Sequence, residues 1–219
     1  MMNRLVLHFL LLSVASLATI VQANPQQKHL SIMKTMADSE AEKVPGHNNA
    51  TYSPVPKEEQ LFSVEFLEIA PTPMIADRVF FIYLRGYMPS NIKIPSEDET
   101  PKFPVSGPTP DPYLQNATLV LTSSVTYADK THITHSPLTI PFKSTVFNDA
   151  AHLVIRDEKG KEVEFLPRVG RVDLLLDFQI PWVFLRSGFW RFGVEGRVVE
   201  GGKCLFAFEF VQWLDGGMR

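Results

Sequence analysis

Beyond about residue 60, the chain is a series of short apolar runs in which apolar and polar positions alternate. The clearest run is Arg171 to Ile180. Its even positions, from Val172 to Ile180, are all apolar, whereas its odd positions are polar except for Leu175. A period of two residues places successive side chains on opposite faces of a β-strand. The run therefore predicts a strand with one buried face and one solvated face.

Similar patterns predict seven further strands and two hairpins. Glycine-containing connections, Lys159-Gly160 and Gly201-Gly202, each join two neighbouring runs, which is typical of a hairpin. No helix of consequence is expected. The fold class is therefore predicted to be all-β, an immunoglobulin-like antiparallel β-sandwich of about seven or eight strands. A closed barrel has the same alternation and remains an alternative. The seven further runs cover residues 62–69, 79–87, 117–127, 152–156, 163–166, 189–198 and 204–213.

The first 23 residues have the pattern of a cleavable signal peptide. Arg4 precedes a nearly unbroken apolar run from Leu5 to Ile20, and Ala23 ends a segment suited to signal peptidase. A membrane anchor is the alternative, but no stop-transfer pattern follows the run. We therefore expect a secreted, extracellular protein, with the vacuolar or lysosomal lumen as another destination. Secretion makes Asn49 and Asn116, each followed by Ala-Thr, candidate glycosylation sites.

Two other segments differ from the strand-rich part. Residues 24–60 are polar with little periodicity, and we interpret them as a flexible tail or propeptide. Residues 61–214 then form the β-sandwich domain, interrupted by a proline-rich insert at 88–116. Such a proline density is incompatible with a strand ladder. We interpret the insert as disordered or loosely ordered, with a lid over a binding site as the alternative.

Charge and cysteine content exclude several classes of protein. The net charge is −3, and this balance gives no electrostatic basis for nucleic-acid binding. The single cysteine, Cys204, rules out a disulfide within the chain, so the fold must depend on its apolar core. We interpret Cys204 as a small buried side chain, with intermolecular pairing or a reactive thiol as alternatives.

The sequence contains no constellation that predicts catalysis, a metal or a cofactor. His132 and His135 are three residues apart, which on a strand places them on opposite faces, so we interpret them as solvated. Asp173 and Asp177 share a strand face with Arg171, and a solvated outer surface explains them better than paired acid–base catalysis. We therefore expect a protein that is not an enzyme.

The 16 phenylalanines indicate either a well-packed core or two sheets that accept a lipid between them. Three stretches, residues 64–73, 180–190 and 200–204, resemble the ML lipid-recognition domain family, which includes the Niemann-Pick type C sterol carrier and fungal phosphatidylglycerol/phosphatidylinositol transfer proteins. The chain departs from this family in lacking its disulfides and in the length of the proline-rich insert.

The resemblance implies a carrier that holds a sterol or phospholipid between its sheets and contacts membranes transiently. An interaction module with a solid core, binding a protein partner, is the alternative. The residues expected to face inward and to line a lipid cavity are Phe80, Ile82, Leu84, Leu121, Leu174, Leu176, Phe178, Trp190, Phe192 and Phe206.

Overall fold

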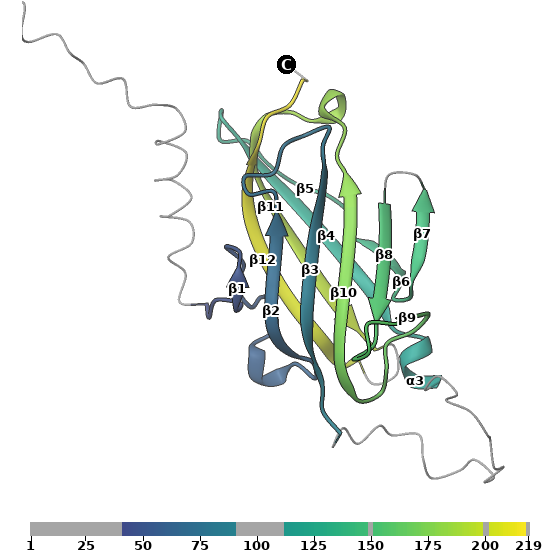
Figure 1. Cartoon of the computed structure of the whole chain (residues 1–219). Coiled ribbons are helices and arrows are strands. Elements are labelled where there is room, and N and C mark those ends of the chain that lie inside the picture. Colours follow the sequence, from purple (N-terminus) through teal and green to yellow (C-terminus); the bar gives the residue numbers. More distant parts are fainter. Residues whose placement is uncertain (1–40, 91–111, 149–150, 199–201, 218–219) are drawn as a thin grey trace, which may run out of the picture. The chain divides into compact units, whose positions relative to one another are not determined.

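The computed structural model describes residues 41–90, 112–148, 151–198 and 202–217, all within one compact unit, Ser39–Arg219 (Figure 1). The expected signal peptide, residues 24–40 of the expected tail, and residues 91–111 of the proline-rich insert lie outside the described residues. Within the described part, no helix has the length and apolarity needed to span a membrane.

Two mostly antiparallel sheets pack face to face, which confirms the all-β sandwich. The first sheet has the order β1-β2-β3-β10-β8-β7, with β9 also paired to β8, and only β1 pairs in parallel. The second has the order β12-β11-β4-β5, with β6 also paired to β4. The first sheet comprises β1 Gly46–His47, β2 Ser63–Ala70, β3 Val79–Met88, β7 Thr145–Asn148, β8 Ala151–Arg156, β9 Glu162–Val163 and β10 Gly170–Gln179. The second comprises β4 Thr118–Tyr127, β5 His132–Thr134, β6 Leu138–Pro141, β11 Gly188–Arg197 and β12 Cys204–Leu214.

The described residues therefore contain twelve strands, more than the seven or eight expected. The long strands β2, β3, β4, β10, β11 and β12 lie close to their predicted ranges. Those that the alternation did not predict, β1, β5, β6 and β7, have two to four residues each, too few for a period of two to be visible. In the described part of the chain, helical structure is limited to the single turn α3, Pro112–Gln115, and two short 3₁₀ segments.

The core lies between the inner faces of the two sheets. In the first sheet, β3 and β10 pair over ten positions, which sets Phe80 beside Phe178 and Leu84 beside Leu174. In the second, Phe192 pairs with Phe210, and Phe206 and Phe208 continue the inner row of β12. These side chains are buried or pack against the buried cluster. The alternation predicted from sequence thus places the apolar faces toward each other.

Residues 41–60 correct the expectation of a flexible tail from 24 to 60. They form a strap that runs along one side of the sandwich and contacts both sheets. Through β1 the strap pairs with β2, and Thr51 exchanges two main-chain hydrogen bonds with Glu209 of β12. Val44, Ala50 and Tyr52 are buried in the core. The few apolar residues of a polar segment are therefore sufficient to fix it, because both sheet edges supply unpaired main-chain partners.

The strap can be tested by shortening one of its buried side chains. We expect Val44→Ala to lower the free energy of unfolding by about 2 kcal/mol, since two buried methyl groups are lost. Val146→Ala is the matched control, because Val146 is 69% exposed and Val44 only 4%. Urea unfolding followed by tryptophan fluorescence measures both. Equal stabilities for the two variants would contradict an ordered strap.

Candidate functional site

The ten residues expected to line a cavity lie in the inter-sheet core or pack against it. Three of them, Leu121, Phe178 and Phe192, are only partly buried. The other seven are buried: Phe80, Ile82, Leu84, Leu174, Leu176, Trp190 and Phe206. The structure thus brings all ten together between the sheets.

A small cavity lies among these side chains. Its volume is about 20 Å³, and five of the ten residues, Ile82, Leu84, Leu174, Leu176 and Phe206, contribute to its wall. The rest of the wall comes from Leu119, Phe142, Leu153, Val194 and Phe208. This volume is close to what one water molecule requires, whereas ligand pockets are usually about 300–1,000 Å³. At this cavity the two sheets leave no room for a lipid unless they separate.

The two long sides of the sandwich are held together differently. On one side, the strap joins the edges of β2 and β12, and residues 61 and 62 add two main-chain bonds to β12. On the other side, which we call the short-strand side, the edges are β5, β6 and β7. There the crossover from β6 to β7 joins the sheets, with Phe142 buried beneath it. Exposed apolar side chains, Ile133, Leu138 and Val146, mark this side.

A buried glutamine on the inner face was missed in the sequence. Gln212 is in phase with Phe206, Phe208 and Phe210 along β12 and is 1% exposed. Neither its Nε2 nor its Oε1 has a hydrogen-bond partner among the described residues, and the same holds for Nε1 of Trp190, its register partner on β11. The alternation in the sequence could have identified it, since a polar residue that continues a row of three inward-facing phenylalanines must also point inward.

His132 and His135 have separate partners on β4. His132 and His135 are both exposed, as expected, and each contacts a hydroxyl of β4: Nδ1 of His132 lies 3.0 Å from Thr126 Oγ1, and Nδ1 of His135 lies 3.1 Å from Ser123 Oγ. The His135 ring also stacks on Trp190. Across the described ranges, no group of three or more potential ligands gathers around a point.

Cys204 is buried at the start of β12, which confirms its interpretation as a small core side chain. Burial, and the nearby carboxylate of Glu195, raise the pKa of its thiol to about 12. The thiolate is the nucleophilic form, so Cys204 is almost entirely in the unreactive state at neutral pH.

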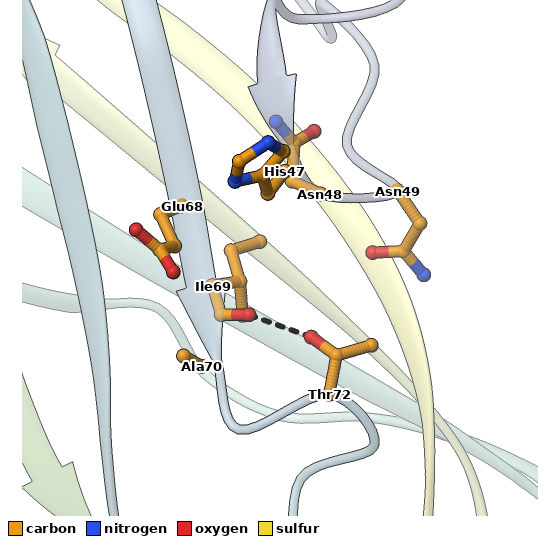
Figure 2. A pocket seen from close by; sticks show the side chains of 7 residues that line it. All are labelled: His47, Asn48, Asn49, Glu68, Ile69, Ala70 and Thr72. Atoms are coloured by element: carbon orange, nitrogen blue, oxygen red, sulfur yellow. Dashed lines mark hydrogen bonds between the residues drawn. The ribbon is translucent and has the colours of Figure 1, made fainter.

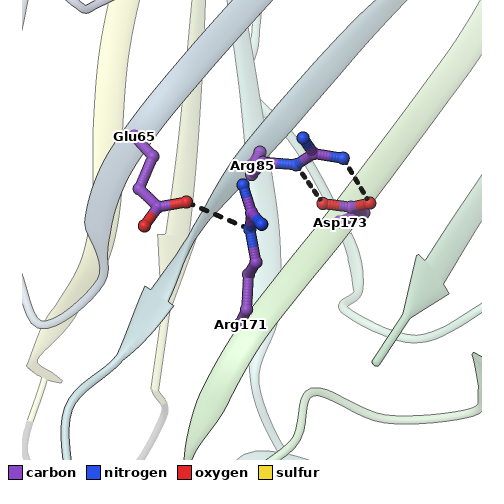
Figure 3. A network of polar contacts seen from close by, with 4 residues as sticks. All are labelled: Glu65, Arg85, Arg171 and Asp173. Carbon is purple, nitrogen blue, oxygen red and sulfur yellow. Dashed lines mark hydrogen bonds and ion pairs between the residues drawn. The ribbon is translucent and has the colours of Figure 1, made fainter. Parts of the chain in front are cut away.

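The outer face of the first sheet carries a ladder of ion pairs (Figure 3). Arg85 donates two hydrogen bonds to the Asp173 carboxylate, at 2.8 and 3.0 Å, and Arg171 lies 3.2 Å from Glu65. The bond from Arg85 lowers the pKa of Asp173 below its usual value. Asp177 instead contacts His152, at 2.7 Å. The two aspartates therefore have separate partners, and this geometry fits a solvated outer surface rather than a catalytic carboxylate pair.

A larger, open groove lies outside the sheets, between the strap and the end of β2 (Figure 2). It has a volume of about 360 Å³ and is lined by His47, Asn48, Asn49, Glu68, Ile69, Ala70 and Thr72. Asn48 Nδ2 donates to Leu67 O at 2.9 Å, and Thr72 Oγ1 to Ile69 O at 2.6 Å, so both side chains are used to hold the main chain. The groove is mixed in character and separate from the apolar core.

The two candidate glycosylation sites differ in environment. Asn116 follows α3 and is exposed, whereas Asn49 is half-buried and its Nδ2 donates to Val211 O at 2.6 Å. A glycan on Asn49 would have to displace this contact between the strap and β12. Asn116 is therefore the accessible site.

Expression through the secretory pathway of a eukaryotic cell should give one N-linked glycan, at Asn116. We expect one mass decrement on treatment with a peptide N-glycosidase, abolished by Asn116→Gln and unaffected by Asn49→Gln. A glycan found on Asn49 of the folded protein would show that the strap is less tightly bound than its contacts indicate.

The sequence matches no protein-family model and no curated protein. The resemblance noted above therefore rests on its three stretches. In the fold the first is most of β2 with the bend after it, and the second is the connection from β10 into β11. In the third, residues 200 and 201 lie outside the described residues, and with Gly201 so does part of the expected Gly201-Gly202 turn.

Proposed function

We propose that the protein is a secreted lipid-binding or lipid-transfer protein that holds a sterol or phospholipid between its two sheets. The observation that carries this proposal is the inter-sheet core, in which a cavity, though small, lies among side chains that are apolar or aromatic. Short edge strands border that core on one side, and they give the sheets a place to separate.

Burial of apolar surface supplies the energy for uptake. Each methylene transferred from water is worth about 0.8 kcal/mol, so an acyl chain exposed to water is unfavourable by on the order of 10 kcal/mol. Separating the sheets exposes apolar side chains, and a lipid placed between them restores their contacts. Opening without a ligand is therefore unfavourable, which accounts for a closed, nearly filled core.

The buried polar groups do not suggest chemistry on the ligand. Among the described residues, the buried polar or charged side chains are Thr51, Glu195 and Gln212. Thr51 is in the strap, and Glu195 pairs with Arg197 at 2.7 Å. Gln212, on the inner face, cannot act as an acid or base. The described interior therefore supplies apolar contacts and an amide for binding a ligand, which supports the binding part of the proposal.

The proposal predicts that filling the cavity weakens lipid binding. Val194 lines the cavity, so Val194→Phe should raise the Kd for a fluorescent sterol or phospholipid about ten-fold, because overpacking costs about 1–3 kcal/mol. Val154→Phe is the control, since Val154 is partly buried on β8 and does not line the cavity. Fluorescence titration measures the affinities, and native mass spectrometry identifies lipid bound to the purified protein.

A second candidate function is a protein-interaction module with a solid core. The cavity volume of about 20 Å³ favours it, because such a sandwich needs no space between its sheets. Absence of bound lipid and of uptake across sterols and phospholipids would overturn the first proposal in favour of this one. Equal affinities of the Val194→Phe and Val154→Phe variants would place any bound lipid outside the core.

A further inference from the structure

Among the buried side chains that the structure describes, Gln212 is the one with both polar atoms unpartnered. It is 1% exposed, and both polar atoms of its amide lack a partner among the described residues. A buried polar group without a hydrogen bond is strongly unfavourable, and native proteins leave few of them. The cavity described above does not reach Gln212, so a water molecule held there would not satisfy it. A group from outside the described chain is the partner that this position lacks.

Trp190 completes the site. It faces Gln212 across the β11–β12 ladder, and its buried Nε1 is a second donor without a partner in the described part of the chain. Together the two side chains offer Trp190 Nε1–H and Gln212 Nε2–H as donors and Gln212 Oε1 as an acceptor. A hydroxyl group, which donates and accepts, matches this set, and a carbonyl oxygen matches its donors.

The site lies near one end of an apolar row, in which the buried Leu214 is the last residue. Phe206 and Phe208 line the inter-sheet cavity, Phe210 follows them along β12, and Gln212 comes next in the same row. At the Gln212 end, the exposed His135 stacks on Trp190 and lies beside Ser123. An elongated apolar molecule lying along this row would bring one end to the amide.

We propose that Gln212 and Trp190 bind the hydroxyl group of a neutral lipid whose apolar body lies along the inner row of β12. This inference rests on the proposed function and narrows its ligand class. Among the described residues no lysine or arginine is buried, so a phosphate bound at this point would have no compensating charge. A phospholipid would have to keep its headgroup outside.

The experiment compares lipids that differ in one hydroxyl group. Dehydroergosterol, a fluorescent sterol, and its methyl ether form one pair, and a pyrene-labelled fatty alcohol and its methyl ether form the other. The full-length protein should bind the alcohol of at least one pair about ten-fold more tightly than the ether, as expected for one buried hydrogen bond. Gln212→Met should abolish that preference while keeping the affinity for the ether. Trp190→Phe should weaken the binding of both the alcohol and the ether, because either oxygen can accept from Nε1–H. Trp213→Phe, on the opposite face and bonded to Asp215, is the matched control.

Thermal unfolding without lipid gives a second readout. Gln212→Met removes an unsatisfied amide, so its Tm should equal or exceed that of the unaltered protein. A lower Tm would show that Gln212 already has a partner and would overturn the inference. A hydroxyl preference that survives Gln212→Met would overturn it as well, leaving lipid binding in place. If the protein binds none of the four lipids and does not bind the phospholipid tested above, the proposed function is overturned, and the inference with it.

Discussion

The structure depends on apolar contact between the inner faces of its two sheets. With one cysteine, which is buried, the chain has no disulfide to join them, and their adhesion comes from packed aliphatic and aromatic side chains. A fully buried side chain of this kind contributes roughly 1.5–3 kcal/mol relative to an exposed one. The same contact stabilises the fold and fills the space in which a ligand would lie. A ligand between the sheets would therefore have to replace contacts between core side chains.

The strap makes the two sheets more strongly joined along one side of the sandwich than along the other. Along β2 and β12, main-chain hydrogen bonds from residues 41–62 reinforce the apolar contact between the sheets. Along β5, β6 and β7, the edge strands have three or four residues, and exposed apolar side chains occur there. On the short-strand side the β6–β7 crossover joins the sheets, with Phe142 N donating to Ala117 O and Ser144 N to Glu164 O. We infer that the sheets part along the short edge strands on either side of this crossover, where the described residues contain no strap. The partly buried side chains Leu121 and Phe192, on β4 and β11, leave the second sheet's inner face incompletely covered.

The long strands could be predicted from sequence because a period of two repeated over ten residues is unambiguous, as in β10. The strap could not, because Val44, Ala50 and Tyr52 are isolated in a polar segment and are fixed by partners distant in the chain. The ten inward residues follow from alternation alone. The cavity volume does not, since it depends on how facing side chains interdigitate. The position of Gln212 on the inner face could have been predicted, because it follows the phenylalanines of β12 at a period of two. Its lack of hydrogen-bond partners could not, because that depends on how the interior is packed.

The most direct test of sheet separation is a distance measured across the short-strand side. Spin labels at Thr122 on β4 and Arg156 on β8, both exposed, report the spacing of the sheets by pulsed electron resonance. A second pair, at Ser63 on β2 and Val211 on β12, reports the strap side. The account predicts that saturating sterol or phospholipid lengthens the first distance and leaves the second unchanged. A first distance that stays constant while lipid is bound would contradict it.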